Sequence, residues 1–229
     1  MKTPVVFDFE TMPIEGWPQY PPRPVGVSIL LPKRKPKYFA FGHQAGNNCD
    51  ERTAKGALAE AYAFAQKTGC GLLAHNFKFD GDVAETHWGL SLPAWQGLHD
   101  SMFLIFLSDP HSQTLALKPA SERILGLPPD EQDAVRDWLI ANKLMAKNAK
   151  EIGPLIWRAP GDVVGPYANG DTLRTLKLFM KLYPEILARG MGEAYDRERR
   201  LLPVLLRNEH QGVPVDYKLM KADDAKYEG

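Results

Sequence analysis

Two acidic side chains interrupt an apolar run near the start of the chain, in the segment Val-Val-Phe-Asp-Phe-Glu-Thr. Residues 5–10 alternate with the period of a strand, so Asp8 and Glu10, two positions apart, leave the same face of it. A solvated strand edge is the ordinary explanation for such a pair, but the flanking valines and phenylalanines favour a buried strand. Buried carboxylates are costly unless something neutralises them. The pair therefore predicts a bound hard cation, for which carboxylate oxygens are the preferred ligands.

A further acid, Asp80, stands in the segment His-Asn-Phe-Lys-Phe-Asp, at the transition from a short apolar strand to a predicted helix. Asn76 precedes it by four positions. Asp82 and Glu85 compete with Asp80 for the functional role. On a helix Asp82 points away from Asp80, and we expect both competitors to be solvated.

The third segment, Tyr-Ala-Asn-Gly-Asp, places Tyr167 and Asp171 four positions apart. Pro166 is favoured in the first turn of a helix, and on that helix the two side chains share a face. Gly170 lowers helix stability, so it serves either close packing or the close approach of a substrate. One such pair alone is weak evidence, but the three segments together could hold two divalent cations. Two such cations can catalyse the hydrolysis of a phosphodiester bond.

The hydrophobic pattern predicts that strands come first and then alternate with helices, which indicates an α/β or α+β layer fold around a central sheet. The predicted strands are 5–10, 25–31, 38–41 and 72–74, and the predicted helices are 54–69, 80–88, 166–190 and 193–209. The apolar stripe expected on the longest helix consists of Leu173, Leu176, Met180, Tyr183 and Leu187.

Bulk charge gives no argument for a nucleic-acid partner, because Lys+Arg and Asp+Glu both number 28 and the net charge is zero. Any such contact must be local. The basic hairpin tip 33–37 is interpreted as a solvated turn in preference to a phosphate contact. Trp17 and Tyr20, in a proline-rich loop, could stack on bases, but packing of the loop on the domain is favoured.

Cys49 and Cys70 do not suggest a disulfide framework, so we expect reduced thiols and a cytoplasmic protein. The acids of the first strand interrupt any signal-peptide core, and no apolar run approaches the length of a membrane span. No membrane partner is expected.

In their order along the chain, the three acid segments resemble the three exonuclease motifs of the DEDD superfamily, tyrosine subclass. The segments 99–103 and 117–126 resemble those that follow the second motif in proofreading domains of family A DNA polymerases. Trp-Arg-Ala-Pro at 157–160, running into Val-Gly-Pro-Tyr, is similar to bacteriophage members. Residues 195–216 resemble the junction that leads into the polymerase domain.

This resemblance implies an RNase H-like fold, a central mixed sheet flanked by helices. It implies an exonuclease domain over residues 1–190 and a helical junction segment over 191–229, without the polymerase domain to which it would lead. A stand-alone exonuclease and part of a longer polymerase both stay open.

The resemblance also implies two divalent cations, Mg²⁺ or Mn²⁺. Asp8, Glu10 and Asp171 would hold the first, while Asp8 and Asp80 would support the second. Tyr167 and Glu10 would orient the attacking water, and Asn76 would brace the site. The residues implied to contact substrate are Thr11, Met12, Asn76 and Phe77.

The implied activity is proofreading-type removal of nucleotides from a DNA 3′ end, preferentially single-stranded, with a polymerase domain or subunit as a further partner. A phage-encoded protein would act in the host bacterial cytoplasm. A DEDD-type ribonuclease is the first alternative, and the junction-like segment favours DNA over it. A catalytically inactive DNA-holding module is disfavoured because all four acids and the tyrosine are present. An interaction protein whose C-terminal helix binds a polymerase subunit is the remaining alternative.

Overall fold

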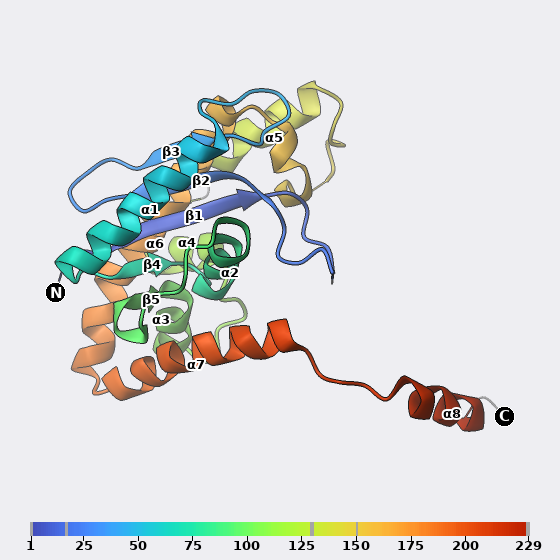
Figure 1. Cartoon of the computed structure of the whole chain (residues 1–229). Coiled ribbons are helices and arrows are strands. Elements are labelled where there is room, and N and C mark those ends of the chain that lie inside the picture. The colour runs from blue at the N-terminus through green and yellow to red at the C-terminus, as the bar shows by residue number, and fades with distance from the viewer. Residues whose placement is uncertain (1, 17, 129–130, 150, 228–229) are drawn as a thin grey trace.

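A mixed five-stranded sheet lies at the centre of the protein (Figure 1). The structure is a computed structural model that describes residues 2–16, 18–128, 131–149 and 151–227, so Trp17 lies outside the described residues. The sheet order is β3-β2-β1-β4-β5, with β1 antiparallel to β2, β2 antiparallel to β3, and parallel pairing of β1 with β4 and β4 with β5. The strands are β1 (Val5–Thr11), β2 (Pro24–Leu30), β3 (Lys37–Ala40), β4 (Leu72–Ala74) and β5 (Leu98–Asp100). The expected mixed sheet is confirmed.

The alternation of β1 separates two parts of the core, and a third part lies between β3, α5 (Glu131–Ala141) and α6 (Gly161–Ala188). The odd-numbered apolar residues of β1, Val5, Phe7 and Phe9, pack with residues of α1 (Glu51–Thr68). Val6, on the opposite face, packs with residues of α6. Because side chains alternate along a strand, the even-numbered acids of β1 fall on the α6 side of the sheet.

Helices cover both faces of the sheet: α6 contacts β1 to β4 on one face, and α1 contacts β1 to β3 on the other (Figure 1). Further helices pack along α6 or beyond β4, and short 3₁₀ turns connect them. They are α2 (Phe77–Trp88), α3 (Ser101–Ser108), α4 (Leu117–Leu125), α5 (Glu131–Ala141), η1 (Trp95–Gly97) and η2 (Gly153–Arg158).

Two expectations for the longest helix are wrong. It begins at Gly161, so Pro166 lies inside the helix and not in its first turn. The predicted apolar stripe is also displaced, because Leu173, Met180 and Leu187 are 38%, 41% and 46% exposed and only its Leu176 and Tyr183 pack against the core. The helix buries a neighbouring face that includes Asp171, Thr172, Arg174 and Thr175 as well as Leu178, Phe179, Leu182 and Ile186. Polar side chains with partners can be buried, and hydrophobicity alone cannot identify such a face.

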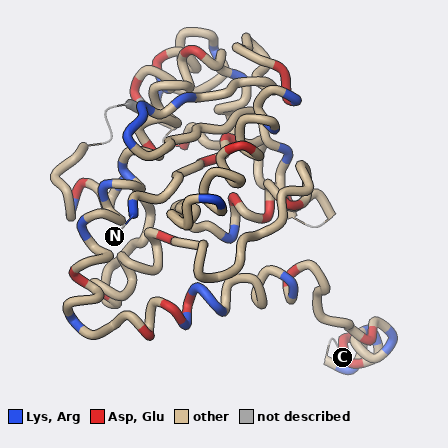
Figure 2. The backbone as a smooth tube through the Cα atoms, turned by 60° about the vertical axis from the view of Figure 1, so that its left-hand side comes forward, with Lys and Arg blue, Asp and Glu red and all other residues tan. Residues whose placement is uncertain are grey.

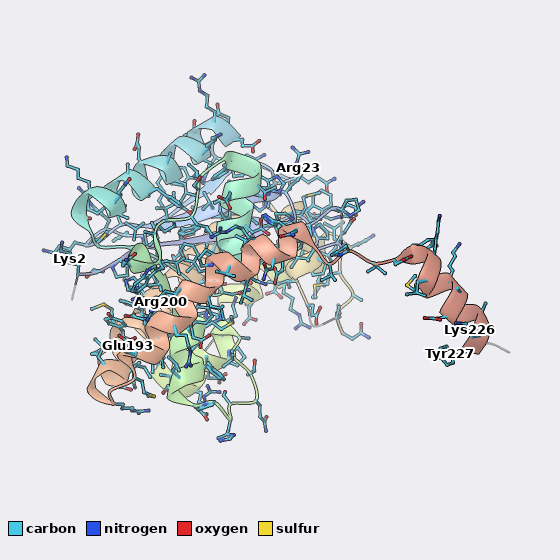
Figure 3. The ribbon with its side chains drawn as sticks, turned by 60° about the horizontal axis from the view of Figure 1, so that its bottom comes forward. Lys2, Arg23, Glu193, Arg200, Lys226 and Tyr227 are labelled. Atoms are coloured by element: carbon cyan, nitrogen blue, oxygen red, sulfur yellow. The ribbon has the colours of Figure 1, made fainter. Side chains whose placement is uncertain are left out.

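The C-terminal part divides into two helices that differ in packing. In α7 (Gly192–Gln211), Tyr195 and Leu202 are buried in the two parts of the core that β1 separates. In α8 (Tyr217–Tyr227), none of the described residues is buried. Figures 1 and 3 show α8 standing away from the body, with Lys226 and Tyr227 at its far end. Among the described helices, none is long and apolar enough to cross a bilayer.

Candidate active site

Three carboxylates from two elements converge on one point between the sheet and α6. Asp8 and Glu10 come from β1, and Asp171 comes from α6. Each offers an oxygen, and these oxygens all lie within 4.8 Å of one another. Glu10 and Asp171 are only 9% and 7% exposed. The structure therefore brings together the same three acids that the resemblance assigns to the first metal, and a set of carboxylate oxygens suits a hard cation.

The position of α6 over β1 depends on close contacts with β2 and β3. A Cβ atom at Gly161 would lie 2.1 Å from the Cβ of Ala40 on β3, so only glycine permits this crossing. Two residues before Asp171, Asn169 accepts a hydrogen bond at 2.8 Å from the Ser28 hydroxyl, and Ser28 pairs directly with Asp8 across the β1–β2 ladder. These contacts set Asp171 above the acids of β1.

Asp80 reaches the same region from the first turn of α2. Its Oδ1 accepts a hydrogen bond of 2.8 Å from the backbone N–H of Phe9, the residue between the two acids of β1. Asp80 is 2% exposed, and it is not one of the three acids whose oxygens lie within 4.8 Å. Its predicted support of a second cation stays a prediction.

Asp100, which the sequence did not suggest, fixes the start of α2. Its Oδ1 accepts from the backbone N–H of Asn76 at 3.0 Å, and its Oδ2 accepts from that of Phe77 at 2.8 Å. Asn76 has a left-handed backbone conformation with φ 62°. The helix therefore starts at Phe77, three residues before the predicted start, since the buried carboxylate satisfies its first N–H groups.

Burial and mutual repulsion perturb the acids of the cluster. Burial, with the charge of Asp171 next, raises the pKa of Asp8 to about 8. Burial and the charge of Asp8 raise the pKa of Glu10 well above its ordinary value, and the same two causes act on the pKa of Asp80. The cluster without metal therefore holds protons at neutral pH, as expected for like charges that share a low-dielectric site.

One cation of the chain, Lys118 of α4, lies within the acid cluster. Its Nζ is 2.7 Å from Asp171 Oδ2 and 3.9 Å from the centre of the Tyr167 ring. Its positive charge opposes the burial that raises the pKa of Asp8 and of Glu10. Local sequence pattern does not predict this role, because a lysine in the first turn of a short helix ordinarily faces solvent.

Tyr167 lies beside the acids, where the resemblance places it. Burial, together with the charges of Glu10, Asp171 and Asp8, raises the pKa of its hydroxyl above the ordinary value. The hydroxyl therefore stays protonated at any physiological pH and can donate a hydrogen bond.

The residues predicted to contact substrate have different surroundings. Thr11 is buried and its hydroxyl donates to Met12 O at 2.8 Å, while the Met12 side chain is half-buried. The Phe77 ring is fully buried, with its centroid 5.4 Å from that of Phe7. The Phe77 ring therefore forms part of the core that supports the site, and the predicted contact of this residue with substrate stays a prediction.

The expectation that Asp82 is solvated is wrong, because this residue is only 1% exposed. Its Oδ1 lies 2.8 Å from His210 Nε2, on α7, which covers α2. A partner 128 positions away in the sequence cannot be recognised from a helical pattern. Gly170 is buried within α6, which favours packing as the reason for this glycine.

Charges of both signs are interspersed along the chain (Figure 2). In the hairpin tip, Lys33, Arg34 and Lys35 are exposed, in agreement with a solvated turn. In the proline-rich loop, Tyr20 is half-buried. Both cysteines are free thiols, as expected.

No family model matches the chain. Two curated relatives share sequence with it. DNA polymerase I of Rhizobium leguminosarum is 29% identical over 149 residues, 65% of this chain and 13% of the relative. DNA polymerase DpoZ of Vibrio phage phiVC8 is 38% identical over 63 residues, 28% of this chain and 10% of the relative. The match therefore spans only a small part of each relative.

Solved structures share the fold at low sequence identity. Brucella melitensis NrnC has a TM-score of 0.60 at 13% identity, covering 92% of this chain and 86% of its own, and it has also been solved with Mg²⁺ and with pGG. Escherichia coli RNase D, an exoribonuclease, has a TM-score of 0.57 at 19% identity over 93% of this chain and 46% of its own. Pol1 of M. smegmatis, in complex with DNA primer-template, has a TM-score of 0.61 at 14% identity over 99% of this chain and 31% of its own. The RNase H-like fold of DEDD exonucleases is confirmed, and the resemblance to the polymerase type has support from sequence.

Proposed function

We propose that this chain, with its DEDD-type fold and its polymerase-like sequence, is a metal-dependent 3′–5′ exonuclease that hydrolyses phosphodiester bonds. The observation that carries the proposal is the convergence of Asp8, Glu10 and Asp171, whose oxygens lie within 4.8 Å of one another in a largely buried site. Burial and then the charge of Asp171 raise the pKa of Asp8 to about 8, so ionising the cluster without a cation is costly. A metal site accounts for both facts.

The donor set fits Mg²⁺ or Mn²⁺, because every candidate ligand is a carboxylate oxygen. Asp8, Glu10 and Asp171 would hold one cation, and Asp8 with Asp80 would support a second. When bound, such cations lower the pKa of a water and stabilise the attacking and leaving oxygens of an in-line displacement.

The chain's own groups would position the reactants. Glu10 is a carboxylate acceptor beside Tyr167, whose protonated hydroxyl can donate, so together they can orient a water from two sides. Tyr167 cannot act as a base, since burial and the acidic charges around it raise the pKa of its hydroxyl and keep it protonated. The hydrogen bond between Asp80 and Phe9 would hold the start of α2 against β1, and that between Asp100 and Phe77 would fix where α2 begins. Together they would keep the acids in place.

DNA is the substrate we favour, because the two sequence relatives are DNA polymerases. Proofreading of a single-stranded 3′ end, in the cytoplasm and together with a polymerase domain or subunit, follows as the most specific form of this proposal. We also propose a junction role for residues 191–229, in keeping with the likeness of Pol1 to 99% of this chain. Of the two helices in this segment, α7 packs with the body and only α8 stands apart. RNA is the second candidate, since RNase D, an exoribonuclease, shares the fold.

The test is digestion of matched 5′-labelled DNA and RNA oligonucleotides in Mg²⁺ and in Mn²⁺, single-stranded and duplex. We expect a ladder that shortens from the 3′ end of DNA and disappears with chelator or with Asp8→Ala. Asp224→Ala, at an exposed position of α8, should leave the ladder unchanged. Shortening of RNA alone would favour the ribonuclease, and a folded wild type that cleaves neither substrate would favour a non-catalytic module.

A further inference from the structure

We propose that Lys118 is a resident counter-ion of the acid cluster, and that a divalent cation entering the cluster displaces its ammonium group from Asp171. The proposal rests on the metal site of the proposed function. It assigns to Lys118 two linked effects: its side chain stabilises the metal-free fold and lowers the affinity of the site for metal.

The position of the ammonium group is the first observation. Lys118 Nζ lies 2.7 Å from Asp171 Oδ2, and the two side chains are 17% and 9% exposed. The same carboxylate belongs to the group of three whose oxygens could share a metal ion. A metal ion at Asp171 and the ammonium group would both be positive and would compete for the same largely buried carboxylate. Each would therefore weaken the binding of the other.

The second observation is that the lysine is held in place by more than Asp171. Its ammonium group lies 3.9 Å from the centre of the Tyr167 ring, within the range of a cation–π contact. Tyr167 and Asp171 stand one turn apart on α6 and Lys118 comes from α4, so two neighbouring groups of α6 hold the ammonium group. Its positive charge also acts to lower the pKa of Asp8 and of Glu10 on β1, against the larger effect of burial.

The consequence follows from linkage between two cations that share one set of acids. In the metal-free protein the ammonium group compensates the largely buried charge of Asp171 and so stabilises the fold. The same contact must be broken when a metal ion binds, which weakens metal affinity. Removing the charge should therefore lower the stability of the metal-free protein and tighten metal binding.

The experiment compares wild type, Lys118→Met, Lys118→Arg and Lys55→Met in titrations with Mg²⁺ alone, followed by calorimetry. Lys55 is an exposed lysine of α1 and matches the loss of net charge. We expect Lys118→Met to bind Mg²⁺ about tenfold more tightly than wild type, within the usual range of coupling between sites. Lys118→Arg and Lys55→Met should stay within about twofold of wild type.

Thermal unfolding in chelator supplies an independent readout. The melting temperature of Lys118→Met should fall by about 3 °C below that of wild type, and Mg²⁺ should raise it by more than it raises that of wild type. Equal or weaker Mg²⁺ binding by Lys118→Met would overturn the counter-ion role alone. No Mg²⁺ binding by wild type or any variant would overturn the metal site and, with it, the proposed exonuclease.

Amine labelling of the wild-type protein tests the displacement even if the variants fold poorly. Reductive methylation followed by mass spectrometry should modify Lys118 several-fold faster in Mg²⁺ than in chelator, while exposed Lys55 reacts at the same rate in both. A Lys118 rate that is unchanged or lower in Mg²⁺ would overturn the proposal, provided that calorimetry detects Mg²⁺ binding.

Discussion

Asp80 Oδ1 accepts a hydrogen bond of 2.8 Å from the backbone N–H of Phe9, which joins the acid of α2 to the strand of Asp8 and Glu10. The two residues are 71 positions apart in the sequence, and both ends of the bond are buried. The bond gives Asp80 a structural role as well as its proposed catalytic one, and the two roles can be separated.

Asp80→Asn keeps an oxygen acceptor for Phe9, whereas Asp80→Ala leaves that buried N–H without a partner. We expect Asp80→Ala to be less stable than Asp80→Asn by about 1–3 kcal/mol, the cost of an unsatisfied buried donor. Urea unfolding in chelator measures the difference. Both variants should lose nuclease activity, and equal stability of the two would contradict the role of the hydrogen bond.

Tyr167→Phe removes a hydroxyl beside the acids and keeps the ring that contacts Lys118. Since the hydroxyl would orient the attacking water, we expect kcat to fall by about a hundredfold, with little change in KM or in melting temperature. Tyr227→Phe, at a tyrosine 88% exposed on α8, is the matched control. A kcat within twofold of wild type would exclude a positioning role for the hydroxyl.

The stability of the metal-free protein should depend on pH through Asp8. Burial and Asp171 raise the pKa of this group from its ordinary 3.8 to about 8 in the folded protein. A raised pKa in the folded state means that the contribution to stability is complete below the unfolded pKa and is lost as pH rises through about 8. One such group changes the unfolding free energy by up to about 1.4 kcal/mol per pH unit between these two values.

The measurement is urea unfolding in chelator from pH 6.5 to 8.5, with wild type against Asp8→Asn. We expect wild type to lose stability as the pH rises and Asp8→Asn to lose less. Comparison with the variant cancels the contributions of other groups, such as His75 and His99, whose pKa values burial lowers to about 4 and about 3. Parallel curves for the two proteins would show that Asp8 is not the titrating group.

Asn76 tests whether its backbone or its side chain serves the site. Its φ of 62° is costly for most residues other than glycine and asparagine. We therefore expect Asn76→Ala to lose about 1 kcal/mol of stability and Asn76→Gly to lose less. If the side-chain amide contacts substrate as predicted, both variants will show a raised KM. An unchanged KM in Asn76→Gly would limit the residue to its backbone role.

Local sequence pattern was sufficient for much of the fold. The strand at 72–74 has the predicted bounds. The alternation in β1 correctly placed Asp8 and Glu10 on one face, and helical spacing placed Tyr167 and Asp171 together. These features depend on the period of a strand or a helix, which a short stretch of sequence specifies by itself.

Tertiary structure alone decided which of several plausible faces is buried and which distant partners meet. The buried face of α6 includes polar residues, Asp82 pairs with His210 of α7, and Lys118 of α4 reaches Asp171. Each of these depends on contact between elements far apart in the chain. A periodic pattern predicts which side chains share a face but not what that face contacts. The acids could therefore be found from sequence, whereas the position of Lys118 among them is visible only in the folded structure.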